Sequence, residues 1–86
     1  MSNKIFKVLD FINRQGLDNS EWGVCENVDR AHFVNECVCR NRYYDGKWLY
    51  VWMANEYALE LYEPATKPDD IIPIEDQDEE LLMYKL

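Results

Sequence analysis

The sequence predicts an α+β domain in which an N-terminal helix packs on a three- or four-stranded antiparallel meander. Two patterns carry this prediction: apolar residues at helical spacing near the N-terminus, and an Asp-Gly pair between two aromatic, β-prone runs. A chain of 86 residues supports one compact domain. Apolar residues form 48% of it, a share that is typical of a packed core and not of a disordered chain.

The helix is predicted over residues 3–15. Its apolar stripe follows the i, i+3, i+4, i+7 spacing of one helical face and consists of Ile5, Val8, Leu9 and Ile12. Ser2 or Asn3 can accept hydrogen bonds from the first amides, and Gly16 follows as a stop. A helix of this length is marginal alone in water, so we expect its stripe to lie on the sheet.

The strongest turn signal is Asp45-Gly46, which suits a two-residue type I′ turn because both of its central residues take positive φ. The turn would pair residues 38–44 with residues 47–53. Alternation along the second run places Trp48, Tyr50 and Trp52 on one face and Leu49, Val51 and Met53 on the other. We expect the helix to cover the aromatic face.

Two further reversals complete the predicted sheet. One, at Asn55-Glu56, returns the chain as a strand over residues 57–62, which Pro64 ends because proline has no amide to donate. The other joins residues 21–28 to residues 32–39. The second of these segments also carries apolar residues at helical spacing, so a short helix over residues 29–37 stays open as an alternative.

Acidic residues are concentrated near the C-terminus. The chain carries 17 acids and 9 bases, for a net charge of −8, and seven of the acids lie between residues 65 and 80 beside a single base, Lys67. We therefore divide the chain into a compact domain, residues 1–64, and an acidic C-terminal extension, residues 65–86. Direct binding to nucleic acid is not expected, because its phosphates need Lys and Arg.

The extension threads Ile71, Ile72 and Ile74 between its carboxylates. A purely solvating tail has no use for such side chains, so they favour docking of the extension on the domain. Glu75 or Asp76 suits the first turn of a short C-terminal helix, where a carboxylate meets the positive end of the helix dipole. A free solvating tail is the alternative, and the order of residues 65–74 is left open.

No motif in the chain points to catalysis, a metal or a cofactor. The candidates are Cys25, His32, Cys37 and Cys39. Alternation along the predicted strands aims them at different faces, which argues against a nucleophile with its base and against a four-ligand zinc site. The acidic run lacks the central glycine of an EF-hand loop. We therefore expect a non-enzymatic protein with no bound metal or cofactor.

Closely spaced carboxylates can stand in for backbone phosphates and steer association with a basic partner. The residues predicted to contact this partner are Asp69, Asp70, Glu75, Asp76, Asp78, Glu79, Glu80 and Tyr62. A nucleic-acid-binding protein or a nuclease is the partner class that fits such a surface. The alternative is a structural or assembly module that self-associates, for example as a homodimer, through its aromatic sheet or the strand over residues 57–62. The acidic extension then serves solubility.

In size and charge the chain resembles the small acidic inhibitors that phages and mobile elements direct against host nucleases, including anti-CRISPR proteins and other nucleic-acid mimics. The resemblance is one of composition and covers no defined block of residues. It implies a viral inhibitor that acts in the host cytoplasm. The N-terminal run MSNKIFKVLDF agrees with a cytoplasmic location, because its charges interrupt any apolar segment of secretory or membrane-spanning length.

Overall fold

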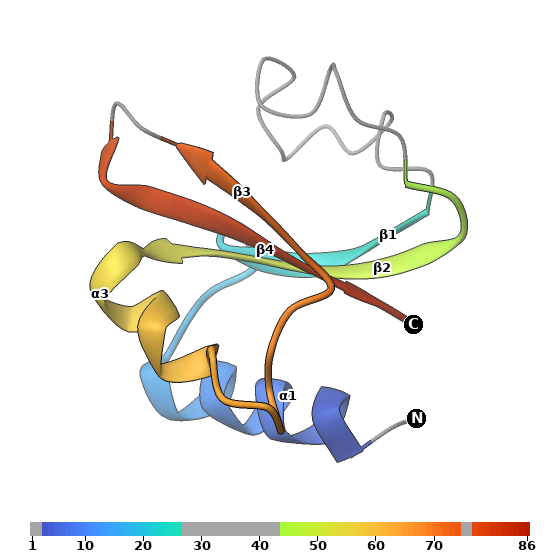
Figure 1. Ribbon diagram of the computed structural model, residues 1–86, viewed down its shortest axis with the longest axis horizontal. Helices are drawn as coiled ribbons and strands as arrows, with labels where there is room; N and C mark the ends of the chain where they lie inside the picture. The colour runs from blue at the N-terminus through green and yellow to red at the C-terminus, as the bar shows by residue number, and fades with distance from the viewer. Residues whose placement is uncertain (1–2, 27–43, 75–76) are drawn as a thin grey trace.

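The computed structural model describes residues 3–26, 44–74 and 77–86, and it confirms the α+β class (Figure 1). The helices are α1 (Asn3–Gln15), the short α3 (Asn55–Ala58) and the 3-10 turn η2 (Leu59–Leu61). The strands are β1 (Trp22–Glu26), β2 (Lys47–Ala54), β3 (Asp70–Ile74) and β4 (Glu79–Lys85). They form one antiparallel sheet in the order β1-β2-β4-β3, and α1 lies along one of its faces.

Helix α1 forms where the apolar spacing predicts it. Its buried face consists of Ile5, Val8, Phe11 and Ile12, with Leu9 packed at the margin. Gly16 follows the helix at φ 70°, and the amide of Leu17 donates to the carbonyl of Ile12. Glycine adopts this left-handed conformation at little cost because it has no Cβ. The predicted end of the helix before Gly16 is therefore confirmed.

Strand β2 alternates as predicted, but the expectation about which face the helix covers is wrong. The core that faces α1 contains Leu49, Val51 and Met53 of β2 and Leu82 and Tyr84 of β4. The cluster on the opposite face contains Tyr50, Leu81 and Met83, with Trp48 and Trp52 packed at its margin. Both faces of β2 are apolar, so alternation alone could not tell which one lies against the helix.

The turn before β2 also differs from the prediction. A type I′ turn needs positive φ at both central residues, and of Asp45 and Gly46 only the glycine has it, at 85°. Apart from Tyr44, the predicted partner strand over residues 38–44 lies outside the described residues. Strand β1 pairs along one edge of β2 and β4 pairs along the other. The described neighbours of β2 are therefore β1 and β4.

Residues 55–61 are helical, so the expected strand over residues 57–62 is wrong. Ala58 and Leu61 are buried whereas Tyr57 and Leu59 are exposed. The buried positions are three residues apart, a spacing that fits one helical face and not the alternation of a strand. Through α3 and η2 the chain leaves the end of β2 and passes to β3 (Figure 1).

The C-terminal region contributes two strands to the sheet. The expected short C-terminal helix is wrong, because residues 79–85 form β4, which pairs with both β2 and β3. Residues 81–84 are four consecutive apolar side chains, all fully buried, as in a central strand that is covered on both faces. Because β4 lies between β2 and β3, the sheet is not the expected meander.

The first segment of the predicted upstream hairpin contains β1. It pairs with β2, and Gly23 lies opposite Tyr50. The second segment, residues 32–39, and the alternative helix over residues 29–37 lie outside the described residues.

Candidate functional site

The predicted contact residues do not lie on one surface. Strands β3 and β4 run antiparallel, so the two ends of the acidic run lie at opposite ends of this hairpin. Asp69 and Asp70 stand at the beginning of β3, whereas Asp78 and Glu79 stand at the beginning of β4. Asp70 pairs with Met83, which lies four residues from Glu79 along β4, so at about 3.3 Å per residue Asp70 and Glu79 are separated by about 13 Å along the strands.

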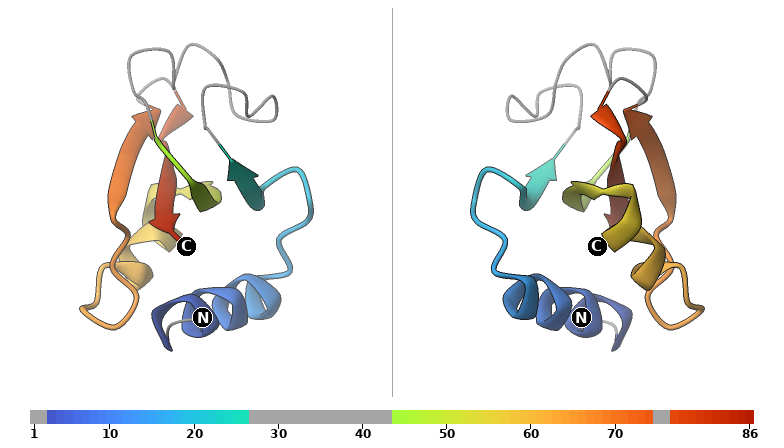
Figure 2. Two further views of the ribbon diagram at one scale, coloured as in Figure 1. Left: turned by 90° about the vertical axis from the view of Figure 1, so that its right-hand side faces the viewer. Right: turned by 90° about the vertical axis from the view of Figure 1, so that its left-hand side faces the viewer.

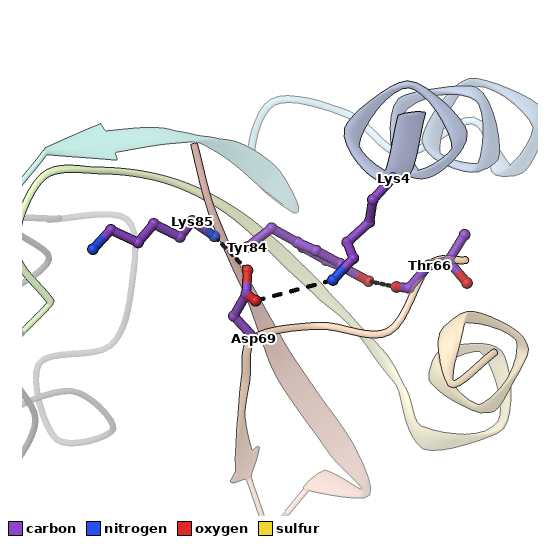
Figure 3. A network of polar contacts seen from close by, with 5 residues as sticks. All are labelled: Lys4, Thr66, Asp69, Tyr84 and Lys85. Carbon is purple, nitrogen blue, oxygen red and sulfur yellow. Dashed lines mark hydrogen bonds and ion pairs between the residues drawn. The ribbon is translucent and has the colours of Figure 1, made fainter. Parts of the chain in front are cut away.

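Asp69 holds the segment before β3 in place (Figure 3). Its Oδ2 accepts a hydrogen bond from the backbone amide of Lys85 at 2.8 Å, and Nζ of Lys4 lies 4.0 Å from its Oδ1. Beside it, the buried Tyr84 hydroxyl donates to the carbonyl of Thr66 at 2.7 Å. Both side chains of the ion pair are partly exposed, so the pair is worth at most about 1 kcal/mol. The network joins α1, β4 and the connection that leads into β3.

Asp70, Glu80 and Tyr62 also make their polar contacts within the chain. Asp70 accepts hydrogen bonds from the Tyr44 hydroxyl and from the amide of Ile71. The Tyr62 hydroxyl donates to the carboxylate of Glu80, at 2.7 Å from Oε2. Only 9% of Glu80 is exposed. These three predicted contact residues are thus engaged inside the domain, and Glu75 and Asp76 lie outside the described residues.

The environment of Glu80 has a consequence for stability. Burial raises the pKa of its carboxyl group above the ordinary value of 4.5, because a site removed from water disfavours the charged form. A group whose pKa is higher in the folded chain than in the unfolded chain contributes stability at low pH. That contribution is complete below pH 4.5 and is lost as the pH rises through the folded-state pKa.

We predict that Glu80→Gln removes this pH dependence. Glutamine keeps an oxygen for the Tyr62 hydroxyl but cannot ionise. The free energy of unfolding of the variant should therefore rise relative to wild type between about pH 5 and about pH 7. Urea unfolding of both proteins at the two pH values measures this change. A constant difference between the proteins, or a change of opposite sign, would contradict the assigned burial of Glu80.

A groove of about 500 Å³ opens at the end of the sheet where β4 begins. Its polar lining consists of Gln15, Ser20, Glu21 and Glu79, and its apolar and aromatic lining consists of Phe11, Leu17, Trp52, Met53, Ala54 and Tyr57. These residues come from α1, the connection to β1, the end of β2, α3 and β4. The right-hand view of Figure 2 faces this end of the molecule, with α3 toward the viewer.

Backbone contacts bring the segments of the groove together. The amide of Trp52 donates to the carbonyl of Glu21 at 2.7 Å, which joins the segment before β1 to the end of β2. The amide of Asn55 donates to the carbonyl of Asp78 at 3.0 Å, which joins the beginning of α3 to the residue before β4. Asp78 adopts φ 53°, a conformation that Asp tolerates better than most residues. Three segments distant in sequence therefore meet at one place.

The charge of the groove is negative. The Glu79 carboxylate has no hydrogen bond or ion pair to another described residue, and Glu21 uses its Oε2 to accept from the amide of Asp18 at 3.0 Å. Among the described residues, no Lys or Arg lines the groove. Arg14, on the same helix as the lining residue Phe11, pairs instead with Asp10 at 3.1 Å. A positively charged ligand is the one that this lining favours.

The residues predicted from the sequence to contact a basic partner do not include Phe11, Glu21, Trp52 or Tyr57, which line the groove. The signal that could have found them is the uninterrupted apolar run at residues 81–84, because such a run indicates a buried strand. Pairing that strand with β2 places Glu79 opposite Ala54, beside Trp52 and α3. The groove follows from this register and not from any local motif.

Within residues 3–26, 44–74 and 77–86, no group of three or more His, Cys, Asp or Glu side chains is arranged to hold a metal ion. No helix in that part of the chain is long and apolar enough to cross a membrane. Cys25 is buried, and the other three cysteine and histidine candidates lie outside the described residues. Comparisons of the chain with protein-family models, curated proteins and solved structures found no match.

Proposed function

We propose that this chain is a small acidic, non-enzymatic binding protein that engages a basic surface on another protein. The observation that supports the proposal best is the groove, in which Glu21 and Glu79 stand beside Trp52 and Tyr57 without a base in the described lining. Aromatic residues are enriched at the centres of protein interfaces. A partner of the nucleic-acid-binding or nuclease class presents the complementary positive surface.

The contact surface of this proposal is narrower than the acidic run. Asp69, Asp70 and Glu80 are engaged within the chain, as described above. Glu21 and Glu79 line the groove, and Glu56 and Asp78 are the sequence neighbours of the lining residues Tyr57 and Glu79. We term these four acids the acidic end. Glu75 and Asp76 lie shortly before Asp78 in the sequence and stay predicted contributors.

Charge supports a protein partner over a nucleic acid. The net charge of −8 repels phosphates and speeds the encounter with a positively charged surface. Carboxylates of the acidic end would occupy the place that phosphates take on the partner, so the proposed action is inhibition by mimicry of nucleic acid. Such an association weakens with salt, because the screening length falls from about 10 Å at 0.1 M to about 3 Å at 1 M.

The test is capture of partners from a cell extract by the full chain, with elution by a salt gradient and identification by mass spectrometry. One triple variant removes three of the four charges of the acidic end and keeps Glu21, whose Oε2 accepts from the Asp18 amide: Glu56→Gln/Asp78→Asn/Glu79→Gln. A matched control removes the same charge from exposed acids elsewhere: Glu26→Gln/Asp45→Asn/Glu63→Gln.

We expect wild type and the control to retain a basic nucleic-acid-binding protein that elutes at moderate salt. The acidic-end variant should retain about tenfold less of it, because it lacks three of the charges that face the partner. Equal capture by all three proteins would contradict the proposal.

Self-association is the alternative function suggested by the sequence, and one of the two surfaces predicted for it is absent from the described residues. The strand over residues 57–62 that could have paired with a second copy is helical. The aromatic face of the sheet keeps Trp48 and Trp52 partly exposed. If the bait captured only itself and resisted high salt, assembly through this face would replace the proposal, because apolar contacts respond little to screening.

A further inference from the structure

We infer that the groove receives an arginine side chain that a loop of the basic partner presents. The inference rests on the proposed function and names the group that anchors the complex. It follows from the aromatic rings of the groove, from its carboxylates and from its size.

The aromatic rings favour a planar cation. Tyr57 is 47% exposed and Trp52 is partly exposed at the groove. A guanidinium group stacks on such rings at about 6 Å or less from the ring centroid. One ring of the groove lining already lies close to a cation of the same chain. The guanidinium of Arg14 lies 5.8 Å from the Phe11 ring centroid.

The carboxylates favour arginine over lysine. The Glu79 carboxylate has no partner within the described chain, and Glu21 uses one oxygen for the amide of Asp18. A guanidinium carries five donors in a planar fork, so it can bond to two carboxylates while its face lies on a ring. The lysine ammonium is a compact point charge and cannot combine these contacts.

The size of the groove suits a side chain together with part of the loop that carries it. Its volume of about 500 Å³ falls within the range of about 300–1,000 Å³ that is usual for ligand sites. A second groove, of about 390 Å³, lies between α1 and η2, but Lys7 and Arg14 line it together with Asp10 and Glu60. Because its two bases balance its two acids, this second groove does not favour a cation. The acidic groove differs from it in having no base in its described lining.

The experiment uses the ¹⁵N-labelled full chain and the peptide acetyl-Gly-Arg-Gly-amide, with the corresponding lysine peptide for comparison. The indole resonance of Trp52 reports occupancy of the groove. We expect a saturable shift and an affinity for the arginine peptide about threefold or more above that for the lysine peptide. Tyr57→Ala keeps the charge of the groove and should weaken arginine binding about fivefold. Leu59→Ala, also at an exposed position, is the matched control and should leave binding unchanged.

Equal binding of the two peptides, or full arginine binding by Tyr57→Ala, would overturn the inference, because charge alone would then account for the association. The capture experiment separates this failure from failure of the proposed function. Suppose that the chain still captures a basic protein through its acidic end while the arginine peptide leaves the Trp52 indole resonance unshifted. That result would support the proposed function and contradict the inferred arginine site. If neither a basic protein nor the arginine peptide binds, both proposals are contradicted.

Discussion

Leu82→Ala is expected to destabilise the fold by about 2–5 kcal/mol, because it leaves a cavity in the core. Leu82 is fully buried in β4, where it pairs with Val51 of β2 and Ile71 of β3. Urea unfolding followed by circular dichroism measures the loss. In a domain of this size each kcal/mol also lowers the melting temperature by roughly 4–8 °C.

The matched control is Leu59→Ala, which removes the same atoms from a side chain that is 63% exposed. Its cost should stay within about 0.5 kcal/mol. If residues 65–86 were an appendage on a compact domain, the Leu82 variant would be nearly as stable as this control. Comparable stabilities would therefore contradict the placement of β4 at the centre of the sheet.

Gly23→Ala is expected to cost about 1–3 kcal/mol, through overpacking between β1 and β2. A Cβ at residue 23 would lie 2.6 Å from the Tyr50 hydroxyl oxygen and 2.8 Å from its Cε1. The Tyr50 ring has little room to retreat, because only 2% of the residue is exposed. The same burial, with a smaller effect of Cys25, raises the pKa of Tyr50 to about 12. An aromatic ring that covers a glycine in the neighbouring strand is a known way of stabilising such a position.

Val24→Ala is the control for this substitution, because Val24 is the next residue of β1 and is 54% exposed. We expect its free energy of unfolding to stay within about 0.5 kcal/mol of wild type. The assigned register of β1 and β2 predicts a clear difference between the two variants. It would be refuted if alanine were tolerated equally well at residues 23 and 24.

Helix α1 could be predicted because its signals are local. The apolar spacing marks its buried face, and Gly16 supplies the conformation that ends it. The alternation of β2 could be predicted for the same reason. The side on which α1 packs could not, because both faces of β2 are apolar and the choice depends on β4.

The role of the acidic region could be predicted only in part. The number of carboxylates in the sequence shows the charge of the region but not which carboxylates accept hydrogen bonds within the fold. Asp69 accepts from the amide of Lys85, and Glu80 accepts from the hydroxyl of Tyr62. Those partners come from segments distant in sequence. The hairpin of β3 and β4 then places Glu79 in the lining of the groove, with Asp78 next to it in the sequence.

We propose that the acidic end, and not the acidic run as a whole, contacts the basic partner. The measurement that tests it most directly is the affinity of the purified captured protein for two double variants at low salt. One is Asp78→Asn/Glu79→Gln, at the groove. The other is Asp69→Asn/Glu80→Gln, which removes the same charge but keeps oxygen acceptors for the Lys85 amide and the Tyr62 hydroxyl.

We expect the groove variant to bind about tenfold more weakly than wild type, and the internal variant to stay within about twofold of wild type once its fold is verified. Equal weakening of the two variants would show that the whole run acts as one surface. That result, or wild-type affinity of the groove variant, would contradict the assignment of the contact surface to the acidic end.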